Sequence, residues 1–248
     1  SVAKDTRLKA LVVDIDSPGG SATGSEVLHR SLQRVAEVKP VYAYIRGMGA
    51  SGGYYLACAA SKIYGLPTAL VGSIGVIYLR PVLEQLLAKV GVEFSVYKSG
   101  EFKDMTGFWR SPTDRESKKF QELIDEIFNN FVTVVVNGRS LEESKVQEVA
   151  TGEVMTAQRA IGIGLVDEIG DFQDTLEAAA VAAGCKPEPK WLRPSRSFTQ
   201  RMFARNSIGR QAGGLSVLDG LQRIMSGGIY YLEPGHISGE DYGLSSQD

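Results

Sequence analysis

A serine enclosed by glycines is the residue of this chain best suited to act as a nucleophile. Ser51 lies in the run Gly49-Ala50-Ser51-Gly52-Gly53, between an apolar stretch at 41–45 and another at 54–60. The first stretch is β-branched and aromatic and predicts a buried strand, and the second predicts a short buried helix, which places Ser51 at the turn between them. The first backbone N–H groups of a helix have no intrahelical acceptor and can stabilise an oxyanion. The commoner role of such a serine is a helix N-cap.

A serine hydroxyl needs a base to attack at neutral pH, and the usual base, histidine, is poorly placed here. The chain has two histidines: His29 on an expected helix and His236 near the C-terminus. Lysine is the alternative base, provided that burial disfavours its ammonium form and lowers its pKa. Lys103 is the candidate, because it follows an expected strand at 92–98 and has apolar neighbours. The alternative role for Lys103 is that of a solvated surface lysine.

Composition limits the other function classes. The 248 residues carry 27 Lys and Arg against 29 Asp and Glu, so the net charge favours neither nucleic acid nor an anionic membrane as a partner. Two cysteines are too few for a disulfide framework, and no spacing of His or Cys predicts a metal site. No apolar run approaches the roughly 20 residues that span a bilayer. The first expected strand begins at residue 8, so we expect the natural protein to have further sequence upstream.

Strands and helices alternate along the sequence, which predicts an α/β fold whose parallel sheet is covered on both faces. Asp14 and Asp16 flank the end of the first strand, and we interpret Asp16 as a turn or cap residue. The expected strands cover 8–15, 41–46, 62–65, 74–78, 92–98 and 165–169. The expected helices cover about 27–36, 52–60, 81–90, 113–137, 141–149 and 171–183.

The C-terminal part has a different character from residue 184 onward. It contains three prolines and five arginines between 187 and 210, and no acidic residue lies among the arginines. The simpler interpretation is a solvated basic segment. The alternative is a segment that docks on a membrane surface or over the protein's own groove.

Four ordered motifs resemble those of the signal peptide peptidase A family, serine proteases of the Clp protease/crotonase-like fold that use a Ser-Lys dyad. The motifs are Asp16–Gly20, Met48–Tyr55, Gly72–Val76 and Lys98–Asp104. The resemblance covers residues 8 to about 183 and matches a half-length form with one set of catalytic motifs. It implies a peptidase domain over 1–183, truncated at its N-terminus, with repeated strand-strand-helix units and a long helix, followed by an extension over 184–248.

The resemblance also implies the roles of individual residues. Ser51 would be the nucleophile that forms an acyl-enzyme, and Lys103 would be its general base. Ser73 would orient the lysine amine, although a serine that satisfies local backbone is the alternative. The N–H groups of Gly20 and Gly52 would form the oxyanion hole, or these glycines would only shape tight turns. No cofactor and no metal are implied.

The family resemblance further implies substrates, assembly and location. The substrates would be remnant signal peptides or other apolar peptides bound as extended strands. Subunits would form a ring in which Ser51 of one protomer meets Lys103 of its neighbour. The protease domain would lie on the outer side of the cytoplasmic membrane, held by an anchor that this chain lacks. The rival interpretations are a crotonase-like enzyme acting on acyl-CoA and a non-catalytic ring-forming scaffold.

Overall fold

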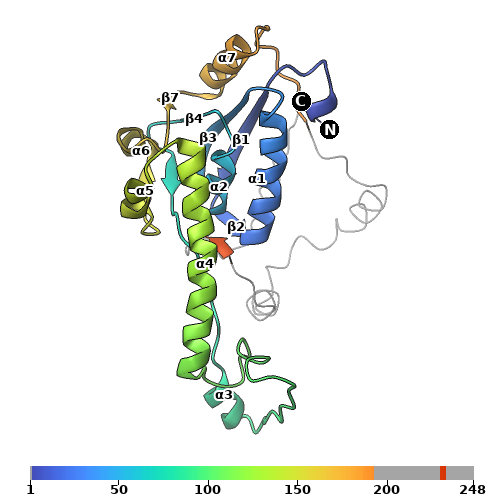
Figure 1. Cartoon of the computed structure of the whole chain (residues 1–248), viewed down its shortest axis with the longest axis vertical. Helices are drawn as coiled ribbons and strands as arrows, with labels where there is room; N and C mark the ends of the chain where they lie inside the picture. Colours follow the sequence, from blue (N-terminus) through green and yellow to red (C-terminus); the bar gives the residue numbers. More distant parts are fainter. Residues whose placement is uncertain (1, 193–229, 233–248) are drawn as a thin grey trace, which may run out of the picture.

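The computed structural model describes residues 2–192 and 230–232, and it confirms the α/β class (Figure 1). Strands of the main sheet follow the order β6-β5-β3-β4-β7, and β1 pairs with the opposite side of β3. All neighbours run parallel except β5 and β6, which are antiparallel. The strands are β1 (Leu11–Ser17), β3 (Val41–Ala50), β4 (Lys62–Gly65), β5 (Leu70–Gly72), β6 (Val154–Thr156) and β7 (Glu168–Ile169).

Seven α-helices and one 3-10 helix, η1 (Val2–Lys4), lie in the described part of the chain. Sequence periodicity predicted most of them to within a few residues. The helices are α1 (Ala22–Ala36), α2 (Gly52–Ala57), α3 (Glu84–Lys89), α4 (Asp114–Arg139), α5 (Glu143–Val149), α6 (Ala157–Ile163) and α7 (Phe172–Ala182).

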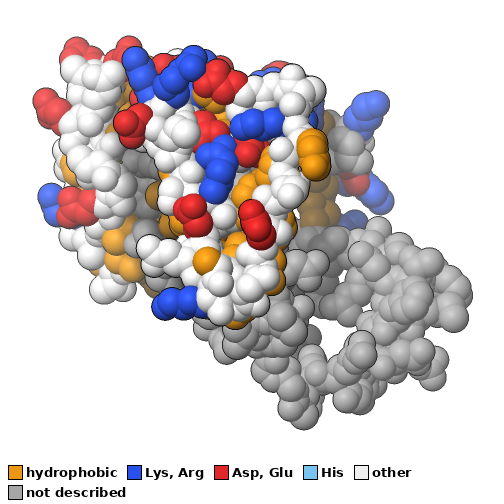
Figure 2. Space-filling view, turned by 90° about the horizontal axis from the view of Figure 1, so that it is seen from below, with side chains coloured by type: hydrophobic (Ala, Val, Ile, Leu, Met, Phe, Trp, Pro, Cys, Tyr) orange, Lys and Arg blue, Asp and Glu red, His pale blue; other side chains and the backbone are white. Residues whose placement is uncertain are grey.

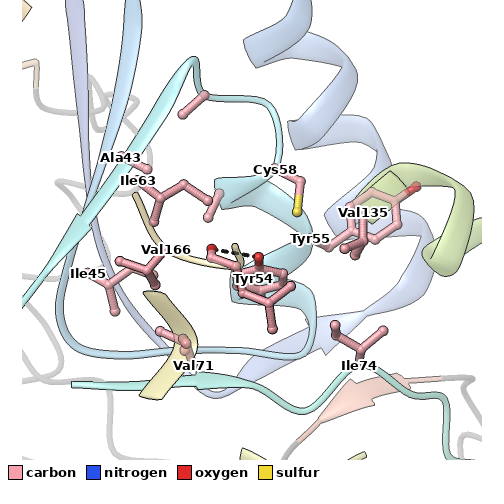
Figure 3. Packing of buried hydrophobic residues seen from close by; sticks show 14 of the residues in the cluster. Ala43, Ile45, Tyr54, Tyr55, Cys58, Ile63, Val71, Ile74, Val135 and Val166 are labelled. Atoms are coloured by element: carbon pink, nitrogen blue, oxygen red, sulfur yellow. Dashed lines mark hydrogen bonds between the residues drawn. The ribbon is translucent and has the colours of Figure 1, made fainter. Parts of the chain in front are cut away.

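The central strand β3 divides the core into two layers, because successive side chains of a strand point to opposite faces. Val41, Ala43 and Ile45 face a large cluster that includes residues of α2 and α4. Tyr42 and Tyr44 face a smaller cluster with α7. In the large cluster Tyr54 of α2 is fully buried, and its hydroxyl donates a 2.7 Å hydrogen bond to the Leu165 carbonyl (Figure 3). This contact fixes α2, and with it the turn that carries Ser51, to the loop before β7.

Helix α4 extends well beyond the sheet and joins the core to a projecting segment, residues 79–112, which we call the arm (Figure 1). Its C-terminal half supplies Phe131, Val132 and Val135 to the core. Its N-terminus directly follows the arm, lies beside α3 and is closed by a capping box between Thr113 and Glu116. The two halves of one helix thus hold the arm at a fixed position away from the sheet.

Two expected strands are wrong. Residues 74–78 form no strand, and the strand in this region is β5, which begins at Leu70. Residues 92–98 are exposed coil in the arm, although Val92, Phe94 and Val96 alternate as they would in a strand. A strand needs a neighbour to satisfy its backbone, and the described chain offers none at this place.

A second, two-stranded sheet was not expected. β2 (Gly19–Ser21) pairs antiparallel with β8 (Tyr230–Leu232), and Gly20 lies opposite Tyr231. β8 also contacts α1 and α2. A short piece of the C-terminal extension therefore lies along the glycine turn that follows β1. The arginines between 193 and 210 lie outside the described residues.

Candidate active site

Ser51 lies at the junction of β3 and α2 in a backbone conformation that few residues other than glycine adopt. Its φ is 53° and its ψ is −118°, its side chain is buried, and it makes no capping hydrogen bond to α2. The Ser51 N–H donates to the Gly72 carbonyl at 2.8 Å, which ties the turn to the neighbouring strand β5. The side chain therefore does not act as a helix cap. A strained residue whose side chain makes no capping bond is typical of functional sites.

Gly52 and Gly20 come together beside this serine. A Cβ placed on Gly52 would lie 3.1 Å from the Gly20 nitrogen and 2.4 Å from the Ser25 Oγ, so only glycine fits at position 52. A Cβ on Gly20 would meet no atom within 4 Å, so the space beside the Gly20 backbone is open. As the first residue of α2, Gly52 has an N–H group without an intrahelical acceptor. The fold thus gathers the two backbones expected to bind an oxyanion.

Ser73 lies next to Ser51 through the pairing of β3 with β5. Ala50 is the register partner of Gly72, so the residues that follow the two strands are neighbours. Ser73 is buried, has a φ of 50°, and donates its N–H to the Glu153 carbonyl at 2.8 Å. Two serines in left-handed backbone conformations therefore end two adjacent parallel strands at the same edge.

Lys103 is not part of this group within one chain. It lies in the arm, and its side chain is exposed and has no hydrogen-bond or ion-pair partner among the described residues. Successive turns hold its backbone, with the Lys103 N–H donating to the Gly100 carbonyl at 3.2 Å. The arm lies at the far end of α4 from the sheet (Figure 1). The structure thus brings together Ser51, Gly52, Gly20 and Ser73, and places Lys103 apart from them.

Other titratable groups near the turn have structural partners. Asp16 accepts a 3.0 Å hydrogen bond from the Met48 N–H, in agreement with its expected role as a turn residue. His29 is buried on α1 with its ring centroid 5.0 Å from that of Tyr55. Burial lowers the pKa of His29, so its imidazole favours the neutral form. Both groups support the packing around Ser51.

Sequence reasoning missed Ser25, whose hydroxyl lies against Gly52. Ser25 lies four residues before His29 on α1. Both polar side chains are buried on the face of α1 that packs on α2. A polar residue at helical spacing on an otherwise inward face was the available signal.

The described residues offer neither a metal cluster nor a membrane-spanning helix. No group of three or more His, Cys, Asp or Glu side chains in residues 2–192 could hold a metal ion. Within the same part of the chain, each helix is too short or too polar to cross a membrane.

Comparison with known proteins finds one family model and several relatives that are named as proteases. The model of peptidase family S49 matches residues 33–186. A putative protease of Synechocystis sp. is 40% identical over 75% of this chain and 67% of its own length. A putative signal peptide peptidase SppA of Enterococcus faecium is 33% identical over 71% of this chain and 52% of its own length. A chloroplastic serine protease SPPA of Arabidopsis thaliana is 31% identical over 92% of this chain and 36% of its own length.

The chain spans about half to two thirds of the first two of these relatives, and about a third of the plant protein. The family match includes α2, α4 and the arm, and therefore the turn with Ser51 and the segment with Lys103. The α/β architecture agrees with the Clp protease/crotonase-like fold expected from the motifs. From the extent of the family match, we conclude that this chain belongs to peptidase family S49.

Proposed function

We propose that this chain is the catalytic part of a serine endopeptidase that uses Ser51 as nucleophile and Lys103 as general base. One observation carries the proposal. Ser51 is buried in a strained backbone conformation, its side chain makes no capping hydrogen bond, and it lies beside the converging backbones of Gly20 and Gly52. A backbone conformation of this kind costs about 1–3 kcal/mol, and the side chain makes no capping bond in return, so a structural role alone explains it poorly. Membership of a peptidase family supports the same chemistry.

The reaction follows from the roles of these groups. The Ser51 Oγ attacks the carbonyl carbon of the scissile peptide bond while a neutral Lys103 amine accepts the hydroxyl proton. The Gly20 and Gly52 N–H groups stabilise the resulting oxyanion. As the carbon–nitrogen bond breaks, the lysine ammonium returns the proton to the departing amine, and an acyl-enzyme remains. Water then releases the acyl group by the same route. Ser73, buried beside Ser51, orients the lysine amine when it is present.

The base comes from a neighbouring subunit in this proposal. Within one chain Lys103 lies in the arm, and the arm exposes many large apolar side chains. Many exposed large apolar side chains gathered in one segment are typical of a protein interface. On the face seen from below, hydrophobic side chains lie open between charged ones (Figure 2). The exposed apolar residues of the arm are Leu79, Val82, Leu86, Val90, Val92, Phe94, Val96 and Tyr97. A ring of subunits would cover this surface and carry each Lys103 to the next Ser51.

The proposed substrates are apolar peptides bound as extended strands, such as remnant signal peptides. β2 accepts β8 as an antiparallel neighbour at Gly19–Ser21, so its edge can hold an added strand beside the Gly20 backbone. We expect a small or apolar side chain before the cleaved bond, because the core around the Ser51 turn is aliphatic and aromatic. Such substrates arise at membranes, and we place the peptidase at the outer side of the cytoplasmic membrane.

Subunit mixing tests the shared dyad. Ser51→Ala and Lys103→Ala proteins are each expected to be inactive on a fluorogenic apolar peptide. After subunit exchange, confirmed with differently labelled chains, the mixture should recover activity, because some interfaces then pair an intact Ser51 with an intact Lys103. An inactive mixture would place the dyad within one chain.

A serine-reactive phosphonate separates the peptidase from its rivals. Labelling of Ser51 in the wild type that disappears in Lys103→Ala supports a nucleophile activated by the lysine. A crotonase-like enzyme would instead bind coenzyme A without labelling, and a scaffold would show neither labelling nor turnover. A matched Lys119→Ala control removes an exposed lysine of α4 that pairs with Glu122, and it should leave labelling intact.

A further inference from the structure

The Lys103 side chain makes no hydrogen bond or ion pair with the described residues. The carboxylate of the next residue, Asp104, is held by two cationic side chains of the arm. Asp104 is buried, and its Oδ1 accepts a 2.6 Å hydrogen bond from the Lys98 Nζ. The Arg110 Nε donates to its Oδ2 at 3.1 Å, and the Arg110 Nη2 lies 3.0 Å from its Oδ1. Hydrogen bonds between ionised groups are about twice as strong as those between neutral groups. The bonds to Asp104 fix the backbone at the position directly after the proposed base.

The same arginine connects the loop to helix α4. Both Nη atoms of its guanidinium donate hydrogen bonds to the Glu116 carboxylate. Nη1 donates to Oε2 at 2.8 Å, and Nη2 donates to Oε1. Glu116 is also buried, and its Oε2 accepts a 2.9 Å hydrogen bond from the Thr113 N–H, which closes the capping box of α4. Arg110 therefore joins Asp104, in the loop that carries Lys103 (the lysine loop), to the first turn of α4, whose C-terminal half packs in the core.

Backbone contacts complete the support. The Arg80 Nε donates to the Gly107 carbonyl at 3.0 Å, and the Arg80 Nη2 donates to the Arg110 carbonyl at 2.9 Å. The Gly107 N–H donates to the Asp104 carbonyl at 2.8 Å. Phe94 and Trp109 stack with ring centroids 5.6 Å apart on the same loop. The loop that carries Lys103 is thus rigid, although the Lys103 side chain itself is free of partners in the described chain.

A general base must be held close to its productive position, since a displacement of about 1 Å can cost a hundredfold in rate. A lysine that crosses a subunit interface cannot be positioned by the fold around the nucleophile, so its own loop has to be stiff. We infer that Asp104 and Arg110 are positioning residues that set the Lys103 amine toward the neighbouring subunit's serine. The inference rests on the proposed function and adds to it the network that holds the loop of the base.

The test uses three mixtures of full-length chains. The reference pairs Ser51→Ala with Lys103→Ala. In the first test mixture Asp104→Asn is added to the Ser51→Ala chain, which supplies the working Lys103. In the second, Asp104→Asn is added to the Lys103→Ala chain, whose lysine loop does no chemistry. The first mixture should lose at least tenfold in kcat with KM within twofold of the reference, and the second should match the reference.

The asymmetry between the two mixtures decides the inference, because a general loss of folding or assembly would affect both. Equal loss in both mixtures, or no loss in the first, would overturn it. Glu101→Gln is the matched control: it breaks the exposed 2.7 Å ion pair between Glu101 of the same loop and Arg115 of α4, and it should leave kcat unchanged. When placed on the Ser51→Ala chain, Arg110→Lys should retain more activity than Arg110→Gln, because lysine keeps a positive charge beside the Asp104 carboxylate.

Failure of the proposed function gives a different result. If the reference mixture is inactive while the wild type turns over peptide, the shared dyad is wrong. The part of the inference that names a neighbouring subunit falls with it, and the homogeneous Asp104→Asn enzyme then tests the remaining part, the positioning of Lys103 by Asp104: a tenfold fall in kcat at constant KM supports that role, and an unchanged kcat overturns it. Light scattering on each sample shows whether the assembly is intact.

Discussion

At the scale of single residues, the backbone of Ser51 opposes stability. Its φ of 53° is costly for serine, and no capping bond offsets that cost. We expect Ser51→Gly to unfold at higher urea concentration than Ser51→Ala, with a difference of about 1 kcal/mol, because glycine relieves the strain and alanine does not. Both variants should be inactive. Equal stability of the two variants would mean that this conformation is not strained in solution.

Gly52 permits the close approach of α2 to the glycine turn. In Gly52→Ala the new methyl group meets the Ser25 Oγ and the Gly20 nitrogen, so we expect a loss of about 1–3 kcal/mol in unfolding free energy and a large fall in kcat. Gly162→Ala is the control, since a Cβ there meets no atom within 4 Å and alanine favours helix α6. That variant should keep full activity and gain slightly in stability. Chemical denaturation and peptide turnover measure both effects, and normal turnover by Gly52→Ala would contradict the site.

At the scale of elements, the junction of the arm with α4 should be sensitive to acid. The Arg110 guanidinium lowers the pKa of Glu116 from 4.5 to about 2, with a further contribution from the Thr113 N–H. A carboxyl group whose pKa is lower in the folded state stabilises the fold above its unfolded pKa and loses that effect as the pH falls through its folded pKa. The junction should therefore weaken between about pH 4.5 and pH 2.

Trp109 reports on this junction, because it lies in the arm against Phe94. In a Trp191→Phe background, which leaves Trp109 as the single tryptophan, its fluorescence should change over that pH range. Glu116→Gln should flatten the acid response and loosen the arm already at neutral pH. An identical acid profile in the two proteins would show that Glu116 does not control the junction.

The pairing of β8 with β2 makes a second prediction at this scale. If β8 lies where substrate adds as a strand, truncation after residue 192 should lower KM for an apolar peptide and leave kcat unchanged. Added peptide spanning residues 226–236 should then inhibit the truncated enzyme competitively. Unchanged KM, together with unchanged binding to lipid vesicles, would leave the extension without a docking role.

At the scale of the whole molecule, the exposed apolar arm should control assembly. Leu86→Glu places a charge on an exposed apolar position of α3 and should dissociate the oligomer and abolish turnover, while the monomer stays folded. Val181→Glu is the matched control, because Val181 is exposed on α7, at the other end of the molecule (Figure 1). Analytical ultracentrifugation gives the mass and circular dichroism the fold. An oligomer that survives Leu86→Glu would place the interface elsewhere.

Local patterns of the sequence were enough to predict much of the fold. Periodicity and glycine turns predicted β1, β3, α2 and α4 because burial on one face leaves a repeat that can be read within a dozen residues. The same signals failed for residues 92–98, whose alternating apolar residues lie exposed in the arm. Alternation indicates that a face is to be covered, and it does not say whether a strand of the same chain covers it. β8 and the β5–β6 pair depend on partners distant in sequence, which no local pattern encodes.

For the candidate site, the sequence by itself determined which residue types were available: a serine among glycines, a second glycine turn, and a lysine without a competing histidine. Only the tertiary structure decided their arrangement. The register of β3 with β5 placed Ser73 beside Ser51, and the packing of α1 and β2 on α2 brought Gly20 and Ser25 to Gly52. The length of α4 separated Lys103 from that group, and the ion pairs of Arg110 stiffened its loop. Distances between residues far apart in the chain are set by sheet register and helix packing, because each is a sum of many contacts that short stretches of sequence do not contain.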